Sequence, residues 1–246
     1  MNNGYYASRS QTLLRDFDET ANLARPELAR RYGAQLAYTL VGDARREFEQ
    51  LIPEIPHIPG FRARALNVFL RATAQELAVY RAWKRHGLSA SEAWEFCHRA
   101  IVARMQAYPA WKNWLLRKLM FSRLMTRRVR KRASMEKPMQ LGDFRVRYLL
   151  GDGESFDWGV DYVACGNYEF MKKQGAEEFA PYVCMSDVAL GEALGWGLTR
   201  TQTLADGCDC CDFRFKKGGG THISSRTPGV QETIERIEAG EALEAV

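Results

Sequence analysis

The sequence has no run of the roughly 18 uninterrupted apolar residues that a membrane-spanning helix requires. With 20 Gly and 8 Pro among 246 residues, it is also too poor in both for a collagen-like or low-complexity chain. Its first residues lack a basic stretch followed by an apolar one, so no signal peptide is expected. Six cysteines in a chain without such a signal predict thiols or metal ligands rather than disulfides. Together with 46% hydrophobic and 26% charged residues, these absences predict a globular, cytoplasmic protein.

Charge is distributed unevenly along the chain. The first 137 residues contain 25 Lys/Arg against 12 Asp/Glu, whereas the remainder contains 10 against 18 and carries five of the six cysteines. Such a shift is typical of a domain boundary, which we place near Lys137-Pro138. We therefore expect a basic helical region over residues 1–137, an α+β domain with the Cys and Asp motifs over 138–220, and a peripheral tail over 221–246.

Apolar residues at helical spacing predict four helices in the basic half. We expect them over residues 25–48, 62–86, 89–108 and 111–132. Two local signals support their ends. Gly87 suits a left-handed cap after the second helix, and Ser89 with Glu92 fits a capping box before the third.

The acidic half shows the alternation of apolar and polar residues that is typical of strands. The expected strands cover residues 144–150, 156–162, 198–204 and 210–216, with helices over 168–173 and 180–194 between the second and third. The order β-β-α-α-β-β with short connections predicts an α+β fold. We expect a four-stranded antiparallel sheet with helices on one face, against which the N-terminal helical region packs.

The residues with the clearest chemical potential lie in two of these elements. Cys184 and Asp187 are three apart, which places them on one face of the expected helix over 180–194. Near a helix N-terminus a thiolate is favoured by the helix dipole. In the last expected strand, alternation directs Cys211 to the apolar side and Arg214 to the opposite side.

These residues form part of a longer pattern. It consists of Cys165, Pro181-x-x-Cys184-x-x-Asp187, Arg200-Thr201 and Gly207-x-x-x-Cys211-Asp212-Phe213-Arg214. The pattern resembles the L-2-amino-thiazoline-4-carboxylic acid hydrolase family, over roughly residues 25–217. The resemblance implies cysteine-related metabolism, in which a cyclic amidine that bears a carboxylate is opened to a carbamoyl-cysteine.

Attack on an amidine carbon needs a nucleophile, a proton donor for the departing nitrogen or sulfur, and a cation for the carboxylate. Cys184 or Cys211 is the expected nucleophile, with Cys165 nearby and Asp187 as proton shuttle or amidinium anchor. The candidate cations follow from the motifs: Arg200 is the stronger choice and Arg214 the second.

A metal site stays open as an alternative to thiol chemistry. Zn²⁺ takes thiolate and carboxylate ligands, and these would be Cys165, Cys184, Cys211 and Asp187. Each of the three cysteines is equally well explained as a core residue, because free cysteines are often buried. We expect no cofactor, with zinc as the alternative.

Residues 117–132 contain eight basic residues and no acidic one, close to Trp111 and Trp114. This composition fits a helix that binds an anionic membrane or a nucleic acid. Because the apolar residues spread over much of the helix, we expect instead that they pack on the protein itself. We therefore expect no membrane and no nucleic-acid partner.

The sequence predicts a thiol-dependent hydrolase of a cyclic amidine or a related C–N bond, with a small carboxylated or amino-acid-derived substrate. Two alternatives use the same residues: a non-catalytic sensor that binds a ligand or a metal, and a cyclase that runs the reaction toward ring closure. The oligomeric state stays open, and a homo-oligomer is compatible with the sequence.

Overall fold

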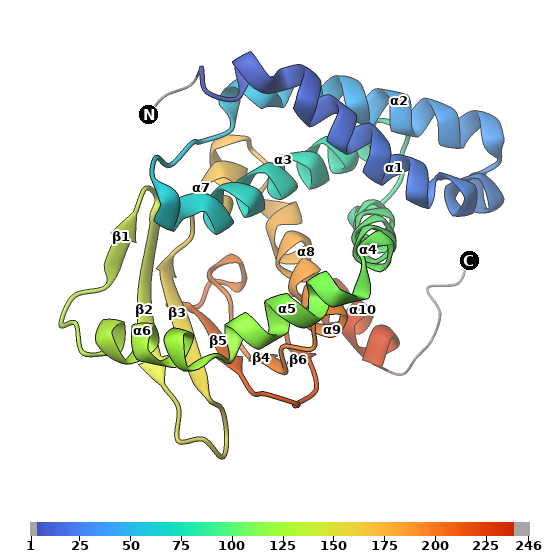
Figure 1. Ribbon diagram of the computed structural model, residues 1–246. Coiled ribbons are helices and arrows are strands. Elements are labelled where there is room, and N and C mark those ends of the chain that lie inside the picture. The colour runs from blue at the N-terminus through green and yellow to red at the C-terminus, as the bar shows by residue number, and fades with distance from the viewer. Residues whose placement is uncertain (1–3, 239–246) are drawn as a thin grey trace. The chain divides into compact units, whose positions relative to one another are not determined.

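The structure, a computed structural model, describes residues 4–238 (Figure 1). By its internal contacts the described chain divides into unit 1, residues 4–104 with 167–183, and unit 2, residues 105–166 with 184–238. This division rests on contacts, whereas the boundary near Lys137 rests on charge. The domain limits expected from charge therefore stay a prediction.

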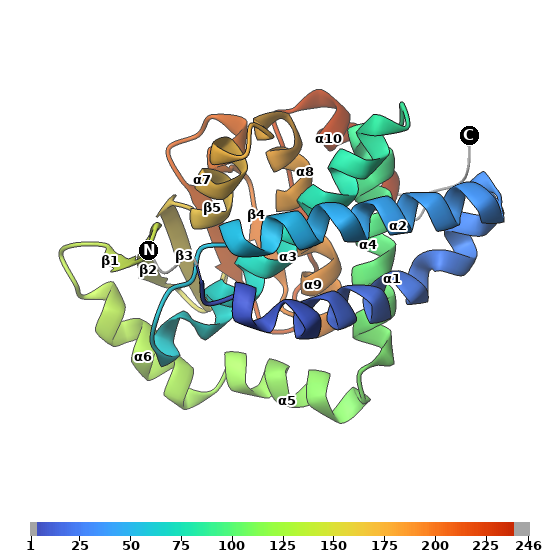
Figure 2. The same cartoon turned by 90° about the horizontal axis from the view of Figure 1, so that it is seen from above.

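Unit 1 is built from helices. They are α1 (Ser10–Tyr32), α2 (Ala34–Leu51), α3 (Arg64–Arg85), α4 (Ala90–Ala107), α7 (Gly166–Lys173) and α8 (Ala180–Cys184), of which α4, α7 and α8 reach the limits of the unit. Helix α2 packs against both α1 and α3, and the three lie close together in both views (Figures 1 and 2). Their shared core contains Leu40, Phe48 and Leu77, which are almost fully shielded from solvent.

The first two helices are separate, whereas the sequence predicts one helix over residues 25–48, so that prediction is wrong. Gly33 divides them with a φ of 81°, a backbone conformation that residues other than glycine rarely adopt. Apolar spacing continues across the break, from Leu28 to Leu40, and this continuity concealed it. Pro26 consequently lies inside α1 rather than in a first turn.

Two local predictions in unit 1 are confirmed. Ser89 Oγ accepts a hydrogen bond from the backbone N–H of Glu92 at 3.2 Å, and Glu92 Oε2 accepts from the N–H of Ser89 at 2.8 Å. Gly87 follows α3 with a φ of 75°, and its N–H donates to the carbonyl of Lys84 at 3.1 Å.

Unit 2 contains a six-stranded mixed sheet. The strands are β1 (Met139–Leu141), β2 (Phe144–Leu150), β3 (Trp158–Ala164), β4 (Leu198–Arg200), β5 (Cys211–Phe215) and β6 (His222–Ile223), in the order β1-β2-β3-β5-β4-β6. All pairs are antiparallel except β4 with β6, which is parallel. The predicted α+β class is confirmed, but the prediction of a four-stranded antiparallel sheet is wrong. The additional strands, β1 and β6, have three and two residues. Strands this short do not show a recognisable alternation of apolar and polar residues.

Four helices complete unit 2: α5 (Ala110–Met120), α6 (Arg123–Ala133), α9 (Ser186–Leu194) and α10 (Pro228–Glu238). Helix α6 packs on β2, where Arg132 Nη1 donates to the Tyr148 hydroxyl at 2.7 Å. The segment predicted as a peripheral tail supplies β6 and α10, and Val230 and Ile234 of α10 are buried. The rest of that predicted tail, residues 239–246, lies outside the described residues.

Helices α5 and α6 replace the single helix predicted over 111–132. The chain leaves α5 at Phe121, and Ser122 caps α6 by accepting a hydrogen bond from the N–H of Met125 at 3.2 Å. No residue of α5 is buried, so the expectation that its apolar face packs on the protein is wrong. Only the side with Asn113 and Met120 is partly covered. Within residues 4–238, no helix is both long enough and apolar enough to cross a membrane.

Candidate active site

One face of the sheet carries the predicted site residues of β4 and β5. Cys211 and Phe213 share this face, and Tyr162 of β3 is the direct register partner of Cys211. Arg200 of β4 lies on the same face, since Leu198 pairs with Phe215 two positions away. The guanidinium carbon of Arg200 lies 5.7 Å from the centre of the Phe213 ring. The alternation read from the sequence thus correctly placed Cys211 on the apolar side.

Arg200 connects the sheet to the segment that carries Cys184 and Asp187. Its Nη1 donates to the carbonyl oxygen of Cys184 at 2.7 Å and to Asp187 Oδ2 at 2.5 Å. The side chain of Arg200 is only 1% exposed, whereas that of Asp187 is 28% exposed. Its Nε is buried and has no hydrogen-bond partner among the described residues. The guanidinium is therefore held through Nη1, while its Nε–H can still donate a hydrogen bond.

Cys184 and Asp187 do not share one helix, so the prediction of a continuous helix over 180–194 is wrong. Cys184 is the last residue of α8, Met185 forms a turn, and Asp187 lies in the first turn of α9. The N–H of Val188 donates to the carbonyl of Met185 at 2.9 Å. The carbonyl of Cys184 instead accepts a hydrogen bond from the guanidinium of Arg200, which lies in β4.

The charges of Asp187 and Arg200 stabilise each other inside the protein. Burial raises the pKa of Asp187, and the charge of Arg200 and its hydrogen bond oppose this rise. Burial is the largest single influence on Arg200 and acts to lower its pKa, but Asp187 and the other acidic groups around it together outweigh burial, and the pKa is raised. The arginine therefore remains charged, while Asp187 accepts a proton more readily than an exposed aspartate.

Both candidate nucleophiles are protonated thiols in this environment. Burial raises the pKa of Cys184, and the positive charge of Arg200 only partly offsets this. Burial likewise raises the pKa of Cys211, and the charge of Cys165 adds to the effect. Cys211 Sγ also accepts a hydrogen bond from the N–H of Leu204 at 3.3 Å, which favours its thiolate. Either thiol must lose its proton to a base before it attacks.

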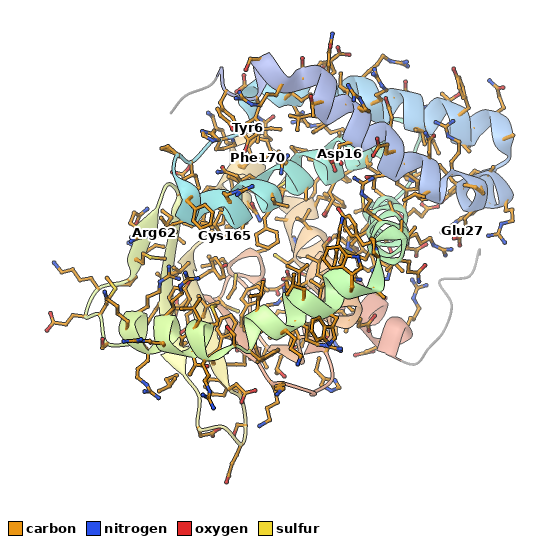
Figure 3. The ribbon with its side chains drawn as sticks, in the orientation of Figure 1. Tyr6, Asp16, Glu27, Arg62, Cys165 and Phe170 are labelled. Carbon is orange, nitrogen blue, oxygen red and sulfur yellow. The ribbon has the colours of Figure 1, made fainter. Side chains whose placement is uncertain are left out.

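Cys165 lies directly after β3 (Figure 3). Its charge acts on Cys211 and on Tyr162, and that of Asp187 acts on both as well. Cys184, Asp187, Arg200 and Cys211 thus lie within reach of one another's charges, and Cys165 lies within reach of Cys211. All five residues belong to unit 2.

Arg214 does not join this group. It lies on the other face of the sheet, where Nη1 donates to Asp161 Oδ1 at 2.8 Å. Its guanidinium also lies 5.5 Å from the centre of the Phe156 ring. The sequence placed Arg214 on that face but retained it as a second candidate cation, and its contacts are those of an ion pair that fixes neighbouring strands.

Three further residues lie near the site, and the sequence analysis did not select them as candidate functional residues. Tyr162 faces Cys211, but only the strand register reveals this. Asp212 accepts hydrogen bonds from the N–H groups of Thr201 and Gln202, both at 2.8 Å, and so holds the chain after Arg200. Asp206 accepts from the hydroxyls of three residues, which are Thr203, Ser225 and Thr227.

The alternative zinc site is not formed by these side chains. Within residues 4–238, no group of three or more His, Cys, Asp or Glu residues is arranged so that it could hold a metal ion. The set Cys165, Cys184, Cys211 and Asp187 therefore does not fit tetrahedral coordination here. Whether the reaction needs a cofactor stays a prediction.

Comparison with known proteins gives one finding. A model of the L-2-amino-thiazoline-4-carboxylic acid hydrolase family matches residues 67–215. This match covers more than half of the chain, from α3 to the end of β5. It includes every predicted site residue: Cys165, Cys184, Asp187, Arg200, Cys211 and Arg214. Neither the curated proteins nor the solved structures give a match.

Proposed function

The chain belongs to the L-2-amino-thiazoline-4-carboxylic acid hydrolase family, and we propose that it opens the ring of a small cyclic amidine that bears a carboxylate. The substrate class that we propose is 2-aminothiazoline-4-carboxylate and close relatives derived from amino acids. We further propose that the reaction depends on a thiol.

The ion pair of Arg200 with Asp187 is the observation that supports this proposal most directly. A protonated amidine with a carboxylate is a compact zwitterion, so its binding site should offer one cation and one anion. Arg200 retains a buried Nε donor beyond its contact with Asp187, and a carboxylate accepts such a hydrogen bond well. Asp187 is partly exposed and offers its charge to the amidinium.

In the proposed reaction, the thiol of Cys184 gives its proton to the carboxylate of Asp187 while its sulfur attacks the amidine carbon. The ring bond from that carbon to the departing sulfur or nitrogen breaks, and the departing atom takes the proton from Asp187. Water then adds to the same carbon and displaces the Cys184 thiol. One water molecule is consumed and the enzyme returns to its starting state.

The elevated pKa of Asp187 supports this role. Burial makes the Asp187 carboxylate a stronger base than an exposed aspartate, although burial also raises the pKa of the Cys184 thiol. The positive charge of Arg200 counteracts the second effect, because it favours the thiolate of Cys184.

The experiment is direct: the purified protein is incubated with 2-aminothiazoline-4-carboxylate, and the product is analysed by mass spectrometry. We expect a product heavier than the substrate by one water. Cys184→Ser should abolish turnover with little change in stability, because the substitution removes the thiol at nearly constant volume. The matched control is Cys210→Ser, at the residue directly before β5, which should retain turnover.

The result can also contradict the proposal. Turnover that survives Cys184→Ser but not Cys211→Ser would identify Cys211 as the nucleophile instead. Turnover that survives both substitutions would exclude thiol dependence. A folded protein that leaves the compound and a panel of related amidines intact would overturn the proposed activity.

A second candidate function is binding without turnover, as in a ligand sensor. The protonated state of both Cys184 and Cys211 favours it, since a protonated thiol is a poor nucleophile. Calorimetric titration that shows stoichiometric binding of the intact amidine, with no product after prolonged incubation, would identify this function.

A further inference from the structure

Helices α5 and α6 present an unusually apolar and basic surface to solvent. Four large apolar side chains on one side of α5 are exposed, with fractions of 62% for Trp111, 51% for Trp114, 41% for Leu115 and 53% for Leu119. Leu116, on another side of the helix, is 48% exposed. Soluble proteins rarely expose so many large apolar side chains next to one another. This cluster is therefore unlike a set of scattered surface residues.

These residues share one side of each helix. Positions 111, 114, 115, 118 and 119 follow the i, i+3, i+4, i+7, i+8 spacing of one face, and positions 124, 127, 128 and 131 repeat it in α6. We define the α5–α6 surface by these exposed residues: Trp111, Trp114, Leu115, Lys118, Leu119, Leu124, Arg127, Arg128 and Lys131. The opposite side of α6 faces the protein, where Val129 is fully buried. Figure 2 shows the two helices following one another along one side of unit 2.

The charge of this surface has one sign. Residues 117–132 contain eight Lys and Arg and no acidic residue. The ammonium of Lys118 lies 4.9 Å from the centre of the Trp114 ring, and that of Lys112 lies 5.8 Å from the Trp111 ring. Exposed tryptophans beside lysines are typical of protein segments at the membrane–water interface, because indole and ammonium both favour the headgroup region.

We propose that the α5–α6 surface binds the surface of an anionic lipid membrane, with the apolar residues of α5 inserted among the headgroups and the arginines of α6 on lipid phosphates. Leu115, Leu119 and Leu124 gain from contact with acyl chains, whereas a nucleic acid offers no comparable apolar surface. A second copy of the chain would bring two strongly positive surfaces together, which opposes association. This attachment is peripheral and independent of the proposed hydrolase activity.

The test is co-sedimentation of the intact protein with vesicles of phosphatidylcholine alone or mixed with phosphatidylglycerol. We expect binding to the mixed vesicles only, and a marked loss when salt rises from about 0.1 M to about 0.5 M. The double variant Leu115→Gln with Leu119→Gln should lower the vesicle-bound fraction at least about tenfold, because it removes two inserted apolar side chains. Arg127→Gln with Arg128→Gln should weaken binding to anionic vesicles as well.

The matched control changes an exposed aromatic and an exposed arginine elsewhere. Phe61 and Arg62 of the short helix η3 (Phe61–Ala63) are both exposed in unit 1, and Figure 3 labels Arg62. Phe61→Ala with Arg62→Gln should bind vesicles like the unmodified protein. Since the substituted side chains are exposed, circular dichroism should confirm the fold of every variant.

Three outcomes would overturn the proposal. The first is no binding to anionic vesicles at low salt. The second is vesicle binding that the control variant loses as strongly as the Leu115 and Leu119 variant. The third is salt-sensitive binding to duplex DNA that the leucine variant leaves unchanged, with no vesicle binding, which would identify a nucleic-acid surface.

Discussion

Arg200 and Asp187 form an ion pair between a buried strand residue and a partly exposed residue in the first turn of a helix, with Nη1 and Oδ2 2.5 Å apart. The pair joins β4 to α9, so the position of the carboxylate depends on the arginine. Because Nη1 also donates to the carbonyl of Cys184, one guanidinium fixes both the proposed base and the backbone of the proposed nucleophile.

Arg200→Lys should raise the Michaelis constant for a carboxylated amidine about tenfold or more. An ammonium cannot donate from several fixed N–H groups as a guanidinium does, so it cannot hold Asp187 and the substrate carboxylate at the same time. Steady-state kinetics on that substrate and on an analogue without the carboxylate measure the effect. Turnover of the analogue should fall less, because a lysine keeps a positive charge beside Asp187 and Cys184. An equal loss on the two substrates would show that Arg200 supports the fold and does not bind the carboxylate.

Alkylation of Cys184 by iodoacetamide should continue to accelerate above pH 9, since burial raises the pKa of this thiol above its ordinary value of 9.0. At pH 8 the rate should be at least about tenfold below that of glutathione. The tryptic peptide over residues 174–200 contains no other cysteine, so mass spectrometry follows Cys184 alone. A rate that levels off below pH 9 would mean that the site stabilises the thiolate instead.

Asp212→Ala should lower the free energy of unfolding by about 2 kcal/mol, because the N–H groups of Thr201 and Gln202 lose their acceptor. Asp212→Asn should lose less, since the amide oxygen still accepts from both N–H groups. Urea denaturation of the two variants measures the difference. Equal losses would indicate that the charge, not the acceptor geometry, stabilises this turn.

Acid should destabilise the protein through His98 of α4. Burial lowers its pKa to about 4 from 6.5, so the unfolded chain binds this proton more readily between the two values. The contribution is complete above pH 6.5 and is lost as the pH falls through about 4, amounting to about 3 kcal/mol. His98→Phe preserves a ring beside Trp94 and cannot be protonated, so its unfolding free energy should fall less between pH 7.5 and 4.5. An identical pH dependence in both proteins would contradict this origin.

The predictions that succeeded depend on neighbouring residues. The capping box of Ser89 and Glu92, the cap at Gly87 and the alternation around Cys211 each involve contacts within a few positions along the chain. The family resemblance likewise rests on short motifs, and the family match confirms it. Residue order alone determines such features, because each is stabilised by hydrogen bonds or burial within one or two turns.

The predictions that failed depend on distant partners. Apolar spacing could not reveal the breaks at Gly33 and Met185, nor the parallel pairing of β6. The sequence selected Asp187 and Arg200 as separate anchors for the two substrate charges, and the fold joined them as a pair. It also assigned the apolar residues of α5 to the core, and the fold left them exposed. The sequence by itself selected the candidate site residues. Only the tertiary structure decided which of them meet, because a buried charge finds its partner through strand pairing and helix packing between segments that local patterns treat as independent.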